Sequence, residues 1–123
     1  MTRSLIALNT LIFALYFSNP NAFNYVIDNF AMTPADLSQG KELWSVLTCV
    51  FLHGSIMHLV GNMYFLHIVG DNLEDVLGYK RFLMWYLVCG LLASFASFIV
   101  SPMSAIPGVG ASGAIAGLFG MYL

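Results

Sequence analysis

Four apolar segments alternate with polar ones along the chain. Residues 82–100 form the longest uncharged segment, and their length approaches the roughly 20 apolar residues that cross a bilayer core. Residues 56–73 are apolar with a few polar interruptions, and Gly78 separates these two segments. The pattern predicts an all-α fold, a polytopic membrane helix bundle with spans at about 4–18, 56–73, 82–100 and 111–123.

The first segment has two competing interpretations. Its apolar core, residues 5–17, is shorter than a bilayer-crossing helix and follows Arg3, so a signal-peptide core is the competing interpretation. Residues 19–22, Asn-Pro-Asn-Ala, offer no small-x-small cleavage site, which favours a retained span. Residues 19–55 then predict an outer aqueous loop with one or two short helices.

Composition supports the membrane prediction. Hydrophobic residues make up 59% of the chain and charged residues 8%, whereas soluble domains carry about 25% charged residues. The net charge of −2 comes without a basic run, so no nucleic-acid partner is expected. Cys49 and Cys89 lie in apolar stretches and predict packing roles, with no metal or cofactor site.

Basic residues predict the orientation of the chain. Arg3 precedes the first segment and Lys80 and Arg81 join the second to the third, while Lys41 lies in the opposite compartment. This three-to-one distribution favours a cytoplasmic N-terminus. We therefore expect a multi-pass integral membrane protein whose 19–55 loop and residue 111 lie on the same outer side.

Polar residues interrupt the second apolar segment in a directed way. His58 and Asn62 are four residues apart and so share one helix face near its outer end. Such a pair is either a set of hydrogen-bond donors facing a site or an interhelical polar clamp. His67 lies about half a rotation away, and we expect it to pair with Asp71 at the cytoplasmic boundary.

A serine among small residues begins the fourth segment. Ser112 lies in Gly-Ala-Ser-Gly, residues 110–113, where unpaired amides of a first helical turn could stabilise an oxyanion. The alternative is helix packing, in which Gly113 and Gly117 make a GxxxG step and Ser112, Ala116 and Gly120 form a small-residue stripe. The residues alone leave both interpretations open.

Taken together, the motifs resemble those of the rhomboid protease family. The resemblance rests on residues 51–62 (FLHGSIMHLVGN) and 110–117 (GASGAIAG), with similar segments at 5–9 and 70–78. It extends in order over nearly the whole chain. It implies a partial rhomboid-like membrane domain over residues 1–123, with about four of the usual six spans.

The resemblance also implies site roles. Ser112 matches the family nucleophile, and its backbone amide joins His58 and Asn62 in the oxyanion hole. His53 matches a histidine that holds the outer loop, and no catalytic role is implied for it. Gly110, Gly113 and Gly117 match structural positions near the site, the last two letting the serine helix approach its neighbour.

Two departures from the family pattern change the expectation. The family base is a histidine in the sixth span, so we expect it beyond the given chain, which alone should be inactive. Many members also carry an aromatic residue one turn after the serine, where this chain has Ala116. The orientation of the base would then have to come from elsewhere.

The resemblance favours an intramembrane serine endopeptidase that cleaves transmembrane proteins near the outer membrane face. Its expected partners are these substrates and membrane lipid, in a bacterial-type inner or plasma membrane, with the oligomeric state open. A non-catalytic rhomboid-like protein that binds transmembrane helices is the alternative, although it has no need of Ser112, His58 and Asn62 together. A membrane protein with ordinary glycine packing is the third hypothesis.

Overall fold

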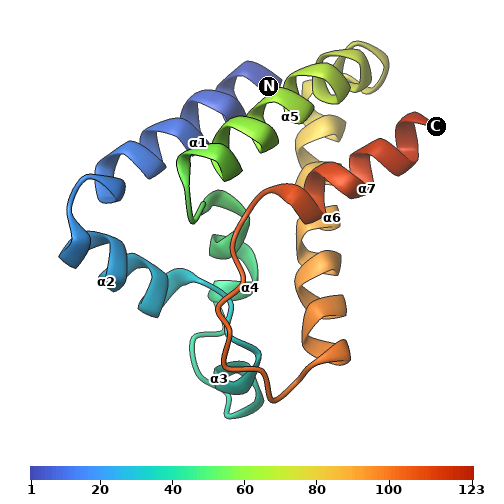
Figure 1. Ribbon diagram of the computed structural model, residues 1–123. Helices are drawn as coiled ribbons and strands as arrows, with labels where there is room; N and C mark the ends of the chain where they lie inside the picture. The colour runs from blue at the N-terminus through green and yellow to red at the C-terminus, as the bar shows by residue number, and fades with distance from the viewer.

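The computed structural model describes residues 1–123 and consists of helices joined by turns and loops (Figure 1). It contains no strand and only one isolated antiparallel bridge, between Met32 and Gly108. The all-α prediction is therefore confirmed. The elements in order are α1 (Thr2–Phe17), α2 (Pro20–Phe30), α3 (Pro34–Ser38), α4 (Ser45–Thr48), the 3-10 helix η1 (Cys49–Phe51), α5 (Ile56–Leu77), α6 (Tyr79–Val100) and α7 (Ser112–Tyr122).

Helix ends follow from local chemistry. Ser55 caps α5, because its hydroxyl accepts a hydrogen bond from the His58 amide at 3.1 Å. Gly78 lies between α5 and α6 with a φ of +78°, a conformation that side-chain-bearing residues rarely adopt. Both helices extend into the charged segment around this turn, beyond the apolar residues 56–73 and 82–100, since charged residues are compatible with helix.

One helix is long and apolar enough to cross a membrane by itself. This is α6, with a mean hydropathy of 2.1 over its best window. The segment Ser45–Phe51 and α5 pass the same test only as a pair, and they are bent by 88° at the break between them. Both α1 and α7 are shorter apolar helices.

The outer segment 19–55 is more ordered than predicted, because it contains α2, α3, α4 and η1 where one or two short helices were expected. Side-chain to backbone bonds hold it together. The Thr48 hydroxyl donates to the Phe30 carbonyl at 2.7 Å, and the Trp44 indole donates to the Asn29 carbonyl at 2.9 Å. Figure 1 shows this segment at the end of the molecule opposite the two termini and the α5–α6 turn.

The loop between α6 and α7 is bonded to that outer segment. Met32 and Gly108 exchange two backbone hydrogen bonds, at 3.0 and 2.8 Å, and the Gly110 amide donates to the Cys49 carbonyl at 2.9 Å. These bonds restrict the conformation of the residues just before α7. The start of α7 is therefore placed by the outer segment as well as by its own packing.

Helix α7 packs on α6 and α5. A Cβ added at Gly113 would collide with the Cβ of Ala93, and one at Gly117 would lie 2.5 Å from the Sγ of Cys89. Both glycines therefore face α6 at close range. Their absent side chains allow the two helix backbones to approach, which sets the depth of α7 in the bundle.

Candidate active site

Ser112 is the first residue of α7, and its side chain is exposed. As the start of a helix requires, the amides of Ser112, Gly113 and Ala114 make no backbone hydrogen bond, and the ladder begins with Ile115 donating to Ala111. The serine hydroxyl thus lies beside free N–H groups. This is the local arrangement predicted from the sequence.

The side chains of His58 and Asn62 meet the loop that leads to Ser112. A Cβ added at Gly110 would lie 2.6 Å from Nε2 of His58 and 3.4 Å from Nδ2 of Asn62. Gly110 also has a φ of +122°, which strongly favours glycine. The same-face prediction for His58 and Asn62 is confirmed, and the space they face is left open by Gly110, two residues before the serine.

Both side chains offer hydrogen-bond donors there. Nδ1 of His58 accepts a long hydrogen bond of 3.5 Å from the Gly54 amide, which places the proton of a neutral imidazole on Nε2. Nδ2 of Asn62 is buried and has no partner among the protein atoms. Buried amide donors without partners are uncommon and are found at sites that bind something. The arrangement suits an oxyanion generated near Ser112.

Two hollows flank the serine. A groove of about 360 Å³ between α5 and α7 is lined on one side by Asn62 and Phe65 and on the other by Ser112 and Ala116. A smaller cavity of about 150 Å³ lies between Ser112 and α6, and its lining residues include Ser94 and Ser97. Ser112 therefore separates an apolar groove from a cavity with polar groups.

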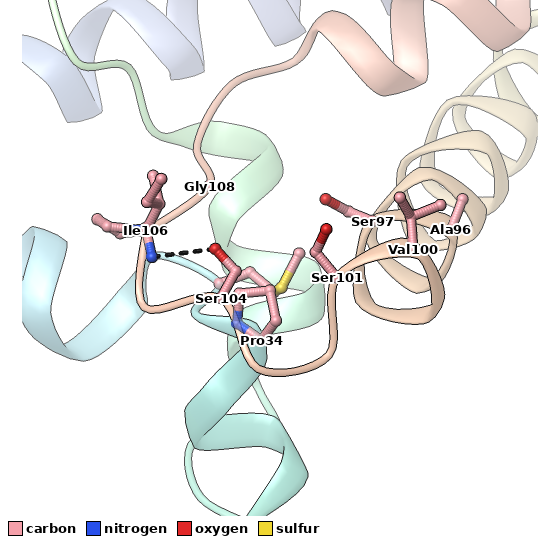
Figure 2. A pocket seen from close by; sticks show the side chains of 10 residues that line it. Pro34, Ala96, Ser97, Val100, Ser101, Ser104, Ile106 and Gly108 are labelled. Atoms are coloured by element: carbon pink, nitrogen blue, oxygen red, sulfur yellow. Dashed lines mark hydrogen bonds between the residues drawn. The ribbon is translucent and has the colours of Figure 1, made fainter.

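A third cavity, of about 480 Å³, adjoins the small one and shares Met32, Ser97 and Gly108 with it. Figure 2 shows this cavity between the end of α6 and the loop that carries Ser104 and Ile106. The Ser104 hydroxyl accepts a hydrogen bond from the Ile106 amide at 3.2 Å. Two adjoining hollows thus lie between segment 19–55 and Ser112, and Ser97 lines both of them.

His53 lies between η1 and α5 and is fully buried. Its ring packs edge-on against that of His58, with centroids 5.1 Å apart, and neither ring nitrogen has a hydrogen-bond partner in the protein. Burial, together with the proximity of His58, lowers the pKa of His53 to about 4. The ring is therefore neutral at physiological pH, and it does not hold the outer loop through hydrogen bonds of its side chain.

Comparison with known proteins assigns the family. The model of the Rhomboid domain matches residues 40–123, which include all the site residues above. The chain belongs to the rhomboid family. It is 39% identical over 123 residues to the rhomboid protease GluP of Bacillus subtilis, covering 99% of this chain and 24% of that protein.

Two further relatives are similar. The putative rhomboid protease YdcA of Bacillus subtilis is 36% identical over 110 residues, covering 89% of this chain and 54% of that protein. RHOMBOID-like protein 5 of Arabidopsis thaliana is 38% identical over 87 residues, covering 71% of this chain and 28% of that protein. This rhomboid chain thus spans between about a quarter and a half of these relatives. Its family and its apolar helix α6 identify it as an integral membrane protein.

The rhomboid structure also shows which of the two small-residue patterns on α7 packs against α6. Gly113 and Gly117 face α6, whereas no protein atom lies within 4 Å of a Cβ added at Gly120. Ser112 and Ala116 are exposed and line the groove. Helix packing among the described residues therefore uses the GxxxG step and leaves the stripe that contains the serine open.

The predicted pair of His67 with Asp71 and the packing of the two cysteines are found in the structure. Nδ1 of His67 lies 3.0 Å from Oδ2 of Asp71, one helical turn away, and this pair does not contribute to the site. Cys49 and Cys89 are free thiols without a disulfide. Cys49 is buried, with its Sγ 3.4 Å from the Ser94 hydroxyl, and Cys89 contacts α7 at Gly117.

Sequence reasoning missed Tyr16 near the end of α1. Its hydroxyl donates to the His53 carbonyl at 2.7 Å and accepts from the His53 amide at 2.8 Å. The two residues are 37 positions apart, and no local pattern links them. A tyrosine among the apolar residues of α1 was the only available signal, because a buried phenol requires a partner for its hydroxyl.

Proposed function

We propose that this rhomboid chain carries the nucleophile and the oxyanion hole of an intramembrane serine endopeptidase that cleaves transmembrane proteins near the outer membrane face. The observation that carries the proposal is the position of Gly110. Gly110 lies next to Nε2 of His58 and Nδ2 of Asn62, and it comes two residues before Ser112, the first residue of α7.

The proposed reaction follows from these groups. The Oγ of Ser112 attacks the scissile carbonyl carbon while a base takes its proton. The carbonyl oxygen becomes an oxyanion and accepts hydrogen bonds from His58, Asn62 and the Ser112 amide. Loss of one such donor costs about 10²–10³ in kcat in a well-studied serine protease. The leaving amine takes the proton, and water then hydrolyses the acyl-enzyme to release the second product.

None of the three histidines in this chain suits the role of base. His58 accepts at Nδ1 and offers only a donor towards the site, and His53 is buried without contact with Ser112. His67 pairs with Asp71 at the far part of α5. We infer that the base is a histidine supplied by a segment outside residues 1–123, as the greater length of the curated relatives permits.

Access to the site supports hydrolysis. The small cavity beside Ser112, lined in part by Ser94 and Ser97, suits water, whereas the groove of Asn62, Phe65 and Ala116 is apolar and suits a peptide from the lipid side. The accompanying topology has a cytoplasmic N-terminus and spans near 4–18, 56–73, 82–100 and 111–123, four of about six. We place it in a bacterial-type inner or plasma membrane.

The test uses the full-length protein, reconstituted in liposomes with a single-pass transmembrane reporter substrate. Ser112→Ala should abolish cleavage and covalent labelling by a fluorophosphonate. Ser4→Ala, which removes an exposed hydroxyl on α1, should leave both unchanged. Labelling or cleavage that survives Ser112→Ala refutes the nucleophile assignment. Retained reporter binding without any cleavage by the unaltered protein supports the helix-binding alternative.

A further inference from the structure

The Tyr16 hydroxyl bonds both backbone groups of His53. As donor it lies 2.7 Å from the His53 carbonyl oxygen, and as acceptor it lies 2.8 Å from the His53 nitrogen. Both groups are buried, and the phenol side chain is only 3% exposed. A single side chain from α1 therefore satisfies the donor and the acceptor of one peptide segment between η1 and α5.

That segment orients the imidazole of His58. The next residue, Gly54, donates its amide to Nδ1 of His58, and this bond leaves the proton on Nε2. At 3.5 Å the bond is long, so it is sensitive to any movement of the Gly54 amide. The His53 ring also packs edge-on against the His58 ring. Both supports of His58 thus come from residues 53 and 54.

We propose that Tyr16 is a positioning residue of the oxyanion hole, acting through the His53 backbone and the Gly54 amide on His58. The inference rests on the proposed function, since it assigns His58 Nε2 as a donor to the oxyanion. Its distinct content is that a hydroxyl on α1, outside the matched region 40–123, sets the direction of that donor. A hydrogen bond to one ring nitrogen fixes the orientation and the tautomer of an imidazole.

The hydroxyl can be removed while the ring is kept. The Tyr16 ring packs against Phe13 and Phe23, with centroids 5.6 and 5.8 Å away, and these contacts are available to phenylalanine as well. Tyr16→Phe therefore removes two hydrogen bonds and little packing. Because the donor acts on the oxyanion and not on the bound substrate, we expect kcat to fall about 10-fold with KM unchanged.

A double-mutant cycle separates positioning from general destabilisation. In a His58→Ala background the donor is already absent, so Tyr16→Phe should lower the residual kcat less than 2-fold. The inference is overturned if Tyr16→Phe lowers kcat by the same factor in the wild-type and the His58→Ala backgrounds. It is also overturned if Tyr16→Phe leaves kcat of the otherwise wild-type protein unchanged. Ser112→Ala in the same assay tests the proposed function separately from the role of Tyr16. Activity that survives Ser112→Ala refutes the proposed function, independently of the result for Tyr16→Phe.

The matched control is Thr48→Val. It removes another side-chain hydroxyl that bonds a backbone carbonyl of segment 19–55, that of Phe30 at 2.7 Å, and makes no hydrogen bond to residues 53, 54 or 58. Because this bond is exposed, whereas those of Tyr16 are buried, Thr48→Val should lower thermal stability less than Tyr16→Phe and leave kcat unchanged. A 10-fold loss of kcat in Thr48→Val would show that loosening the outer segment anywhere is sufficient, and would overturn the specific role of Tyr16.

If Tyr16→Phe does not fold, 4-aminophenylalanine at this position provides the second variant, since its amine still donates to the His53 carbonyl. It should restore at least half of the wild-type kcat. In the ¹⁵N spectrum of labelled histidine, His58 should keep the Nε2-protonated signature in this variant. A folded variant with wild-type kcat in which His58 has lost that signature would contradict the inference.

Discussion

Gly117→Ala probes the close approach of α7 to α6. The added Cβ would lie 2.5 Å from Sγ and 2.6 Å from Cβ of Cys89, whereas carbon atoms in ordinary contact are about 3.5–4.0 Å apart. The helices must separate by about 1 Å, and overpacking of this size costs about 1–3 kcal/mol. Alanine also favours helix over glycine by about 1 kcal/mol, which partly offsets the loss.

Gly120→Ala is the matched control on the same helix. No protein atom lies within 4 Å of its added Cβ, so it carries the same gain in helix propensity without the collision. The propensity contribution cancels in the difference between the two variants. Gly117→Ala should therefore have a free energy of unfolding about 1–3 kcal/mol below that of Gly120→Ala. Titration of the full-length protein with SDS, followed by circular dichroism, measures this difference.

The same change should affect chemistry. Ser112 lies five residues from Gly117, about 7.5 Å along the helix, and moves with it as one rigid element. A displacement near 1 Å can lower the rate about 100-fold. Fluorophosphonate labelling should slow accordingly in Gly117→Ala but not in Gly120→Ala. Cys89→Gly, which removes both colliding atoms, should restore labelling. Equal unfolding and labelling of the two alanine variants would refute the packing argument.

Two other predictions concern the oxyanion side chain and the buried imidazole. Asn62→Ala should lower kcat about 10²–10³-fold with little change in stability, since Nδ2 has no partner to lose. The control Asn72→Ala, which removes an exposed amide bonded to the Ile68 carbonyl, should keep kcat. A loss of stability in Asn62→Ala with kcat unchanged would support the polar-clamp hypothesis. Burial lowers the pKa of His53 from 6.5 to about 4. As the pH falls from 6.5 to 4, His53 therefore takes up a proton in the unfolded state but not in the folded state. The free energy of unfolding should drop by about 3 kcal/mol over this range. His53→Leu should remove this dependence and His67→Ala should keep it, as thermal unfolding at several pH values would show; an undiminished slope in His53→Leu would contradict the burial argument.

Much of the helical organisation could be predicted from the chain because it depends on local properties. The uncharged residues 82–100, the break at Gly78 and the start of α7 at Ser112 follow from hydropathy, from the conformational freedom of glycine and from small residues. The shared face of His58 and Asn62 follows from a spacing of four on any helix. The number of membrane spans remains a prediction, since α6 alone passes the length and hydropathy criteria by itself.

The outer segment was underestimated for a physical reason. Residues 19–55 contain prolines, asparagines and charges, which indicate turns and an aqueous loop. Their helices are short, and short helices are stabilised mainly by tertiary contacts and little by propensity. The bonds from Thr48 to Phe30 and from Trp44 to Asn29 supply such contacts, and they join residues 15 to 18 positions apart.

The sequence by itself thus determined the helices outside residues 19–55 and which polar groups share a helix face, because these depend on neighbours within a turn or two. Tertiary structure alone decided what each face meets. It directed Gly113 and Gly117, and not the Ser112 stripe, towards α6, since the rotation of a helix about its axis is set by its packing partners. It likewise placed Gly110 against His58 and Asn62, and the Tyr16 hydroxyl on His53 across 37 residues, since such contacts form only when separate elements pack together.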